Sequence, residues 1–179
     1  MESKMSETIL QKLRLTDLQQ SLQQAGYRVE IASDPVANIA YLRSATSGLA
    51  FDVRPGNRLA ADDQSFADVA FSAVLQVQGE LPLELVNRWN ASRRFARLQL
   101  SHPFLVFCMD VSASGGITLD HLRTQIEIWD RLVQELIAYL RDELRRPNVA
   151  AGAPDSVASD AAPPSKRPVP EADSPATVQ

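Results

Sequence analysis

The sequence contains few of the residue types that usually build a catalytic or metal-binding centre. Its 179 residues include one cysteine and two histidines. An internal disulfide is therefore impossible, and the separations of Cys108, His102 and His121 match no metal-ligand motif. A single cysteine also fits a reducing compartment. These counts argue against a disulfide framework, a zinc centre and a thiol–histidine enzyme, and we expect a protein without catalytic residues, metal or cofactor.

Long hydrophobic runs and an excess of basic residues are missing as well. The strongest apolar run, residues 104–109, has the length of a strand and is far shorter than the ~20 residues that cross a membrane. The N-terminal residues carry several charges and no apolar run of the signal-peptide type. A net charge of −4 disfavours nucleic acid, because nucleic-acid binding rests on neutralising phosphates. We therefore expect a soluble, cytoplasmic protein with no membrane or nucleic-acid partner.

The composition divides the chain into two parts. With 45% hydrophobic residues, the chain can form one sizeable core. Residues 147–179 contain seven of the eleven prolines and no aromatic side chain. Such a segment buries too little apolar surface to offset the entropy of ordering. The sequence predicts a folded domain over residues 1–146 and a disordered Pro/Ala-rich tail over residues 147–179.

Within residues 1–146, hydrophobic periodicity predicts an α+β fold. Alternation of apolar and polar residues predicts six strands, at residues 28–32, 38–45, 49–54, 67–78, 96–100 and 104–111. Helical spacing predicts three helices, over residues 16–25, from Pro82 through Trp89, and over residues 118–145. The order α-β-β-β-β-α-β-β-α then describes an antiparallel sheet of about six strands with helices packed on it.

Several local signals refine this prediction. Thr16 and Gln19 have the spacing of a capping box, Gly26 is placed to end the first helix, and Thr118 is placed to cap the last one. Residues 59–66, which include Asp62, Asp63 and Gln64, are expected to form a loop. Residues 104–111 are apolar on both faces until Asp110, which predicts an inner strand covered on both sides.

The last predicted helix has more apolar surface than one sheet face requires. Beside its main apolar arc, which includes Trp129, runs a second stripe of Ile128, Leu132 and Tyr139. This stripe could meet the first helix or a second subunit. A tryptophan within so wide an arc is a candidate interface anchor. We therefore consider a homodimer interface formed by Ile128, Trp129, Leu132 and Tyr139.

Residues 85–100 concentrate the candidate binding residues. Asn87 and Asn90 are three positions apart and share a helix face; their amides could bind a partner's backbone, or could bond the helix end and the following strand. Trp89 between them is expected to be a core residue. The stretch also holds the only basic cluster of the domain, formed by Arg88, Arg93, Arg94 and Arg97.

The basic cluster has two interpretations. It could bind a small anion, a nucleotide or an acidic peptide, because guanidinium groups pair with carboxylates and phosphates. Alternatively, Arg93 and Arg94 complement the negative end of the helix dipole while the other two solvate the surface. The acidic balance of the chain favours the second interpretation.

Four motifs resemble the YbjN-like family. They are Val86-Asn87-Arg88-Trp89-Asn90, then Arg94-Phe95-Ala96-Arg97, then the apolar strand that ends at Asp110, and Gly115-Gly116-Ile117-Thr118. The resemblance is sharpest over residues 85–129. The connection Ser101-His102-Pro103 departs from the family's Asp/Gly-rich turn. The resemblance implies a fold similar to type III secretion chaperones and a regulatory role in bacterial sensory transduction, and it carries over no catalytic residue.

Two functional hypotheses follow. The first is a non-enzymatic protein-interaction module, chaperone-like or regulatory, that acts as a homodimer and binds a protein partner. The second is a sensor that binds a small anion or nucleotide through the arginine cluster, with Asn87, Trp89, Asn90, Arg93 and Arg94 as binding residues.

Overall fold

A six-stranded antiparallel sheet forms the centre of the computed structural model, which describes residues 9–59 and 62–145. Across the sheet the strand order is β2-β3-β4-β7-β9-β8. The strands span Glu30–Ser33 (β2), Ala40–Thr46 (β3), Leu49–Pro55 (β4), Asp68–Gln76 (β7), Arg97–Ser101 (β8) and Phe104–Ser112 (β9). The predicted α+β class and the predicted six strands of the main sheet are confirmed.

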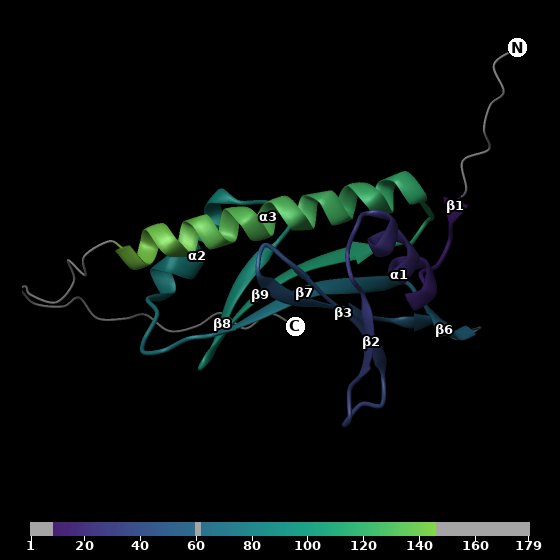
Figure 1. The fold of residues 1–179 in the computed structure, drawn as a ribbon, viewed down its shortest axis with the longest axis horizontal. Helices are drawn as coiled ribbons and strands as arrows, with labels where there is room; N and C mark the ends of the chain where they lie inside the picture. The colour runs from purple at the N-terminus through teal and green to yellow at the C-terminus, as the bar shows by residue number, and fades with distance from the viewer. Residues whose placement is uncertain (1–8, 60–61, 146–179) are drawn as a thin grey trace, which may run out of the picture. The chain divides into compact units, whose positions relative to one another are not determined.

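Three helices complete the domain, at Leu15–Gln24 (α1), Leu83–Ser92 (α2) and Leu119–Arg145 (α3). Helix α3 runs along one face of the sheet (Figure 1). The buried side chains of α1 and α2 belong to the same core as those of α3. Every second residue of the long strands enters this core, as expected for an antiparallel sheet covered on one side. We call the opposite side of the sheet the outer face.

Aromatic rings join α3 to the middle of the sheet. The ring of Trp129 lies 5.1 Å from that of Phe107 and 5.6 Å from those of Phe51 and Phe71, measured between centroids. These side chains come from α3 and from the three strands β4, β7 and β9. Trp129 is completely buried, and rings in such tilted and stacked contacts add to the stabilisation that area burial provides.

The second stripe of α3 also lies inside the domain. Leu132 is buried, and Ile128 packs half-buried against the core. The Tyr139 hydroxyl donates to the Leu85 carbonyl of α2 at 2.7 Å, and its ring lies 5.4 Å from that of Trp89. Helix α2 therefore covers the Tyr139 end of the stripe. Trp129 and Leu132 are therefore core residues and not the interface residues that the apolar pattern suggested.

Two short strand pairings were missed by the sequence pattern. Residues 59–66, expected as a loop, contribute to the antiparallel pair β5 (Arg58–Leu59) and β6 (Asp62–Phe66). A backbone bridge then joins Phe66 to Leu13, with both N–H···O distances at 2.9 Å. A second small pair is formed by β1 (Ile9–Leu10) and β10 (Ile117–Thr118). The β1–β10 pair and the Leu13–Phe66 bridge join residues that are distant in the sequence, whereas β5 and β6 are adjacent along the chain.

Of the three predicted helix-end signals, the structure contradicts one and confirms two. Helix α1 begins at Leu15, with Arg14 at the N-cap and no side-chain cap, so the predicted cap at Thr16 is wrong. The bridge to Phe66 holds Leu13, and the helix starts soon after this fixed point. Gly26 follows α1 with φ +91°, and the Thr118 hydroxyl accepts from the His121 N–H at 3.0 Å; both predictions are confirmed.

Candidate functional site

The asparagine motif on α2 forms a joint between the helix and strand β8. The Asn90 side chain donates to the Leu98 carbonyl at 3.0 Å and accepts from the Leu98 N–H at 2.9 Å. Asn87 is exposed. Trp89 is completely buried; its ring contacts that of Tyr139 on α3, and its ring centroid lies 5.5 Å from that of Phe107 on β9. Of the two interpretations of Asn90, the structure shows the local backbone contact.

This contact also covers part of one edge of the sheet. Strand β8 is the last strand in the order, so one side of its backbone faces no neighbouring strand. The Asn90 amide pairs with both backbone groups of Leu98, as another peptide unit would. Exposed edges invite pairing with other chains, and proteins commonly cover or interrupt them. Asn90 therefore covers the Leu98 position of the β8 edge.

The arginines of the basic cluster are directed to different partners. Arg88 pairs with Glu143 of α3, and Arg93 pairs with Glu135 of α3 at 2.9 Å. Arg97 lies on β8 and pairs across to Asp110 of β9 on the outer face. Arg94 lies over the Phe95 ring. The structure thus separates the four guanidinium groups, and an anion would compete with existing carboxylate partners at three of them.

The outer face carries an apolar strip at one end of strands β7 and β9. Val74 is directly opposite Val106 in the strand register, and Phe104 is two residues from Val106 on the same strand. Val74 is 54% exposed and Phe104 is 43% exposed, while Val106 is half-buried. None of the three belongs to the hydrophobic core. We call Val74, Phe104 and Val106 the outer-face apolar strip.

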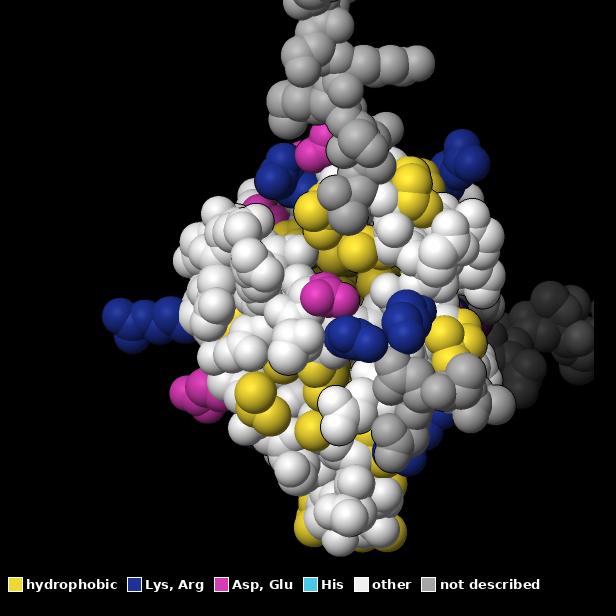
Figure 2. Space-filling model, turned by 90° about the vertical axis from the view of Figure 1, so that its right-hand side faces the viewer, with side chains coloured by type: hydrophobic (Ala, Val, Ile, Leu, Met, Phe, Trp, Pro, Cys, Tyr) yellow, Lys and Arg dark blue, Asp and Glu magenta, His cyan; other side chains and the backbone are white. Residues whose placement is uncertain are grey.

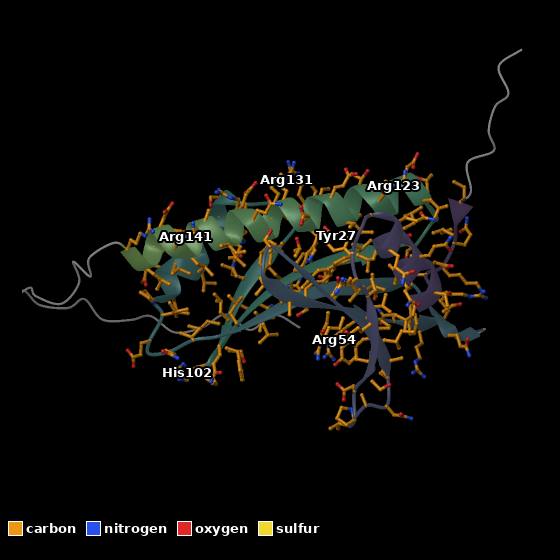
Figure 3. The ribbon with its side chains drawn as sticks, viewed as in Figure 1. Tyr27, Arg54, His102, Arg123, Arg131 and Arg141 are labelled. Atoms are coloured by element: carbon orange, nitrogen blue, oxygen red, sulfur yellow. The ribbon has the colours of Figure 1, made fainter. Side chains whose placement is uncertain are left out.

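The other end of the outer face carries a network of ion pairs. Arg43 binds Asp52 at 2.9 Å, and Arg54 binds both Asp52 at 3.0 Å and Asp34 at 3.3 Å. The Arg54 guanidinium also lies 4.2 Å from the Tyr41 ring centroid. In Figure 3 Arg54 lies on the side of the sheet away from α3, whereas the labelled Arg131 projects from the solvent side of α3. The outer face thus combines an ion-pair network with an apolar strip.

Cys108 lies on the outer face between these two regions, but its surroundings do not activate the thiol as a nucleophile. It faces Ser72 and Arg97 in the strand register and is largely buried. Burial raises the pKa of the Cys108 thiol; the Arg97 guanidinium acts in the opposite direction, and Asp110 adds to the rise. His102 and His121 are exposed and lie outside this contact. Among the described residues, no group of three or more His, Cys, Asp or Glu side chains is placed to hold a metal ion.

The raised pKa leads to a testable expectation for thiol reactivity. At neutral pH the folded protein should react slowly with a thiol-specific disulfide reagent, because the reactive thiolate is rare and the sulfur is covered. Unfolding in denaturant should raise the rate by about tenfold or more. The absorbance of the thiolate that the reagent releases reports the reaction of Cys108 alone, since Cys108 is the single cysteine of the chain. Equal rates in the folded and unfolded states would show that the thiol is activated after all.

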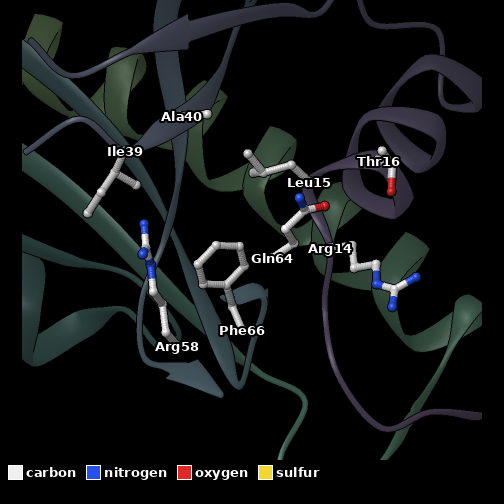
Figure 4. Close-up of a pocket in the computed structure, with 8 residues that line it drawn as sticks. All are labelled: Arg14, Leu15, Thr16, Ile39, Ala40, Arg58, Gln64 and Phe66. Carbon is white, nitrogen blue, oxygen red and sulfur yellow. The ribbon is translucent and has the colours of Figure 1, made fainter. Parts of the chain in front are cut away.

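A cavity of about 390 Å³ lies between the start of α1, the start of β3 and the β5–β6 pair. Its floor is apolar, with Leu15, Ile39 and Phe66, and Arg58 extends along its wall toward Ile39 (Figure 4). The volume is at the small end for ligand pockets. The end of the molecule that carries α1 shows hydrophobic side chains only in small groups among polar and charged ones (Figure 2). No sequence pattern pointed to this cavity, because its lining residues are dispersed along the chain.

The fold and surface define an α+β domain with helices on one face of an antiparallel sheet and an open, partly apolar face on the other. A family model whose description reads "Putative bacterial sensory transduction regulator" matches residues 14–142, and the chain belongs to this YbjN family. Comparison with curated proteins and with solved structures gives no match. In the described part of the chain, no helix is long and apolar enough to cross a membrane.

Proposed function

We propose that this domain is a non-enzymatic protein-binding module, of a regulatory or chaperone-like kind, that works in the cytoplasm and contacts its partner through the outer-face apolar strip. The membership of the YbjN family supports the regulatory part of this proposal. The observation that carries the binding part is strand β9, whose residues are apolar on both faces.

Strand β9 is an inner strand, as predicted, but its coverage differs from the prediction. Leu105, Phe107 and Met109 enter the core, whereas Phe104 and Val106 point to the outer face, where the described part of the chain provides no second layer. Strands that are apolar on both sides usually lie between two layers. A protein partner that seats on the outer face would supply the second layer.

The surroundings of the strip match those of protein interfaces. An apolar centre with a polar rim is the usual anatomy of such contacts. Here the polar groups on the same face are the Arg97–Asp110 pair and, farther from the strip, the ion pairs of Arg43 and Arg54. Because these charges already neutralise one another, the partner need not carry a net charge of one sign.

The proposal is tested by placing a photo-crosslinking amino acid at position 74. In a bacterial cell that produces the protein, this position is expected to crosslink to a discrete partner. Leu83 of α2 is the matched control, because it is similarly exposed and apolar but lies away from the outer face. Crosslinking at position 83 should yield no such product.

A pair of surface substitutions completes this test. Val74→Lys combined with Phe104→Lys should lower partner recovery by about tenfold or more, because central interface positions carry most of the binding energy. Leu83→Lys should leave recovery unchanged. Both variants should melt like the wild-type protein in circular dichroism. Equal recovery by the two variants, or crosslinks of the same kind from positions 74 and 83, would refute the proposed surface.

A further inference from the structure

The two edges of the main sheet differ. Asn90 pairs with the backbone of β8 at one edge. At the other edge, β2 pairs with no strand on its outer side within residues 9–59 and 62–145. The β2–β3 hairpin extends from the sheet on the side away from α3 (Figure 1). An unpaired edge strand is a template for a further strand.

The hairpin geometry identifies the backbone groups that face outward. The Asp34 N–H donates to the Ile39 carbonyl at 2.9 Å, which continues the β2–β3 ladder toward the turn. Bonded and non-bonded pairs alternate in an antiparallel ladder, so Ala32 also bonds to β3. The N–H and C=O groups of Ile31 and Ser33 therefore point outward. The Ile31 side chain at the same place is 61% exposed.

We infer that β2 pairs antiparallel with β2 of a second copy of this chain, forming a dimer with a continuous sheet. The charges around β2 select the register. With the two-fold axis at Ile31, Arg28 of each copy, two residues before β2, comes opposite Asp34 of the other, one residue after β2. A shift by one ladder step in one direction places Glu30 opposite itself, and in the other direction places Glu30 opposite Asp34. Like charges directly opposite each other destabilise a strand pair, whereas opposite charges stabilise it.

The charges are also arranged as a symmetric contact requires. A two-fold interface uses the same patch on both subunits, so complementary groups must lie at equal distances on either side of the axis. Arg28 and Asp34 each lie three residues from Ile31. Arg28 has no ion pair among the described residues. Asp34 is ionised, since the N–H groups of Ala37 and Val36 and then Arg54 lower its pKa.

This dimer uses a different surface from the outer-face apolar strip, and the two proposals can fail separately. Sedimentation velocity of the full chain over a concentration series should show a monomer–dimer equilibrium. Ile31→Pro should sediment as a monomer. Proline removes an N–H that points outward, and at an edge strand this leaves the ladder to β3 intact. Circular dichroism melting should confirm that this variant is folded.

A charge substitution tests the register independently. Arg28→Glu places a like charge opposite Asp34 twice in the dimer and should raise the dissociation constant by roughly 2- to 30-fold. Arg28→Lys should dimerise like the wild type. Val36→Lys is the matched control, because Val36 lies at the hairpin tip and is almost fully exposed.

Three results would overturn the inference. The first is a wild-type protein that remains monomeric at every concentration. The second is a folded Ile31→Pro variant that still dimerises. If that variant does not fold, an unchanged dissociation constant for Arg28→Glu would overturn the inference instead. The third is a dimer that Val74→Lys dissociates, because such a dimer would associate through its outer faces.

Discussion

Replacing Trp129 with alanine is expected to lower the free energy of unfolding by about 3–5 kcal/mol, the usual cost of removing a large buried aromatic side chain. Trp129 is completely buried and contacts rings of three different strands. Its removal would leave a cavity where α3 meets the centre of the sheet. Since domains of this size are stable by only about 5–15 kcal/mol, the variant should lose much of its stability.

Urea unfolding followed by circular dichroism measures this loss directly. Leu144→Ala is the matched control on the same helix, because Leu144 is 71% exposed and should change stability by less than about 0.5 kcal/mol. Trp129→Phe should cost less than alanine. It keeps a ring against Phe107 and removes an indole N–H that has no hydrogen-bond partner among the described residues. Equal stability of Trp129→Ala and Leu144→Ala would return Trp129 to the surface as a candidate interface residue.

Asn90→Ala is expected to destabilise the domain by about 1–3 kcal/mol, because two hydrogen bonds are lost and both backbone groups of Leu98 lose their partner. The substitution also uncovers the β8 edge, so the variant should aggregate more readily on heating. Denaturant unfolding gives the stability, and light scattering during a thermal ramp gives the aggregation.

Asn87→Ala is the control for this substitution. Asn87 lies three residues earlier on the same helix and is exposed, so its truncation should change stability by less than about 0.5 kcal/mol. Asn90→Asp should fall between the two, because the carboxylate still accepts from the Leu98 N–H but cannot donate to its carbonyl. If both asparagines behaved alike, the joint between α2 and β8 would not depend on Asn90.

The long elements could be predicted because their periodicity reflects one-sided burial. A sheet covered on one face imposes alternation, and β3, β4 and β7 show it with buried Leu42, Phe51 and Phe71. The short pairs β5–β6 and β1–β10 could not be predicted. Residues 59–66 show no apolar alternation, so β5 and β6 left no strand signal, and β1 pairs with β10 because chain segments that are distant in sequence meet, as Leu13 and Phe66 also do.

The candidate site was predicted only in part. The spacing of the asparagines identified a joint or a binding pair, and the contact of Asn90 with Leu98 distinguishes between these alternatives. The basic cluster is continuous in sequence but not in space, because Arg97 follows the turn from helix to strand and reaches the outer face. The sequence showed that β9 is apolar on both faces. It did not show that one of these faces has no second layer over it within the described residues.

The sequence by itself determined the fold class, the six strands of the main sheet and the family, because these rest on local periodicity and on a motif that is continuous along the chain. Only the tertiary structure decided which apolar surface is left exposed. Trp129 and Leu132 of α3 are buried within the domain, whereas Val74 and Phe104 on the outer face and Ile31 of β2 are among the apolar side chains that stay exposed. Exposure depends on which elements meet across the whole domain, and residue order alone does not specify that arrangement.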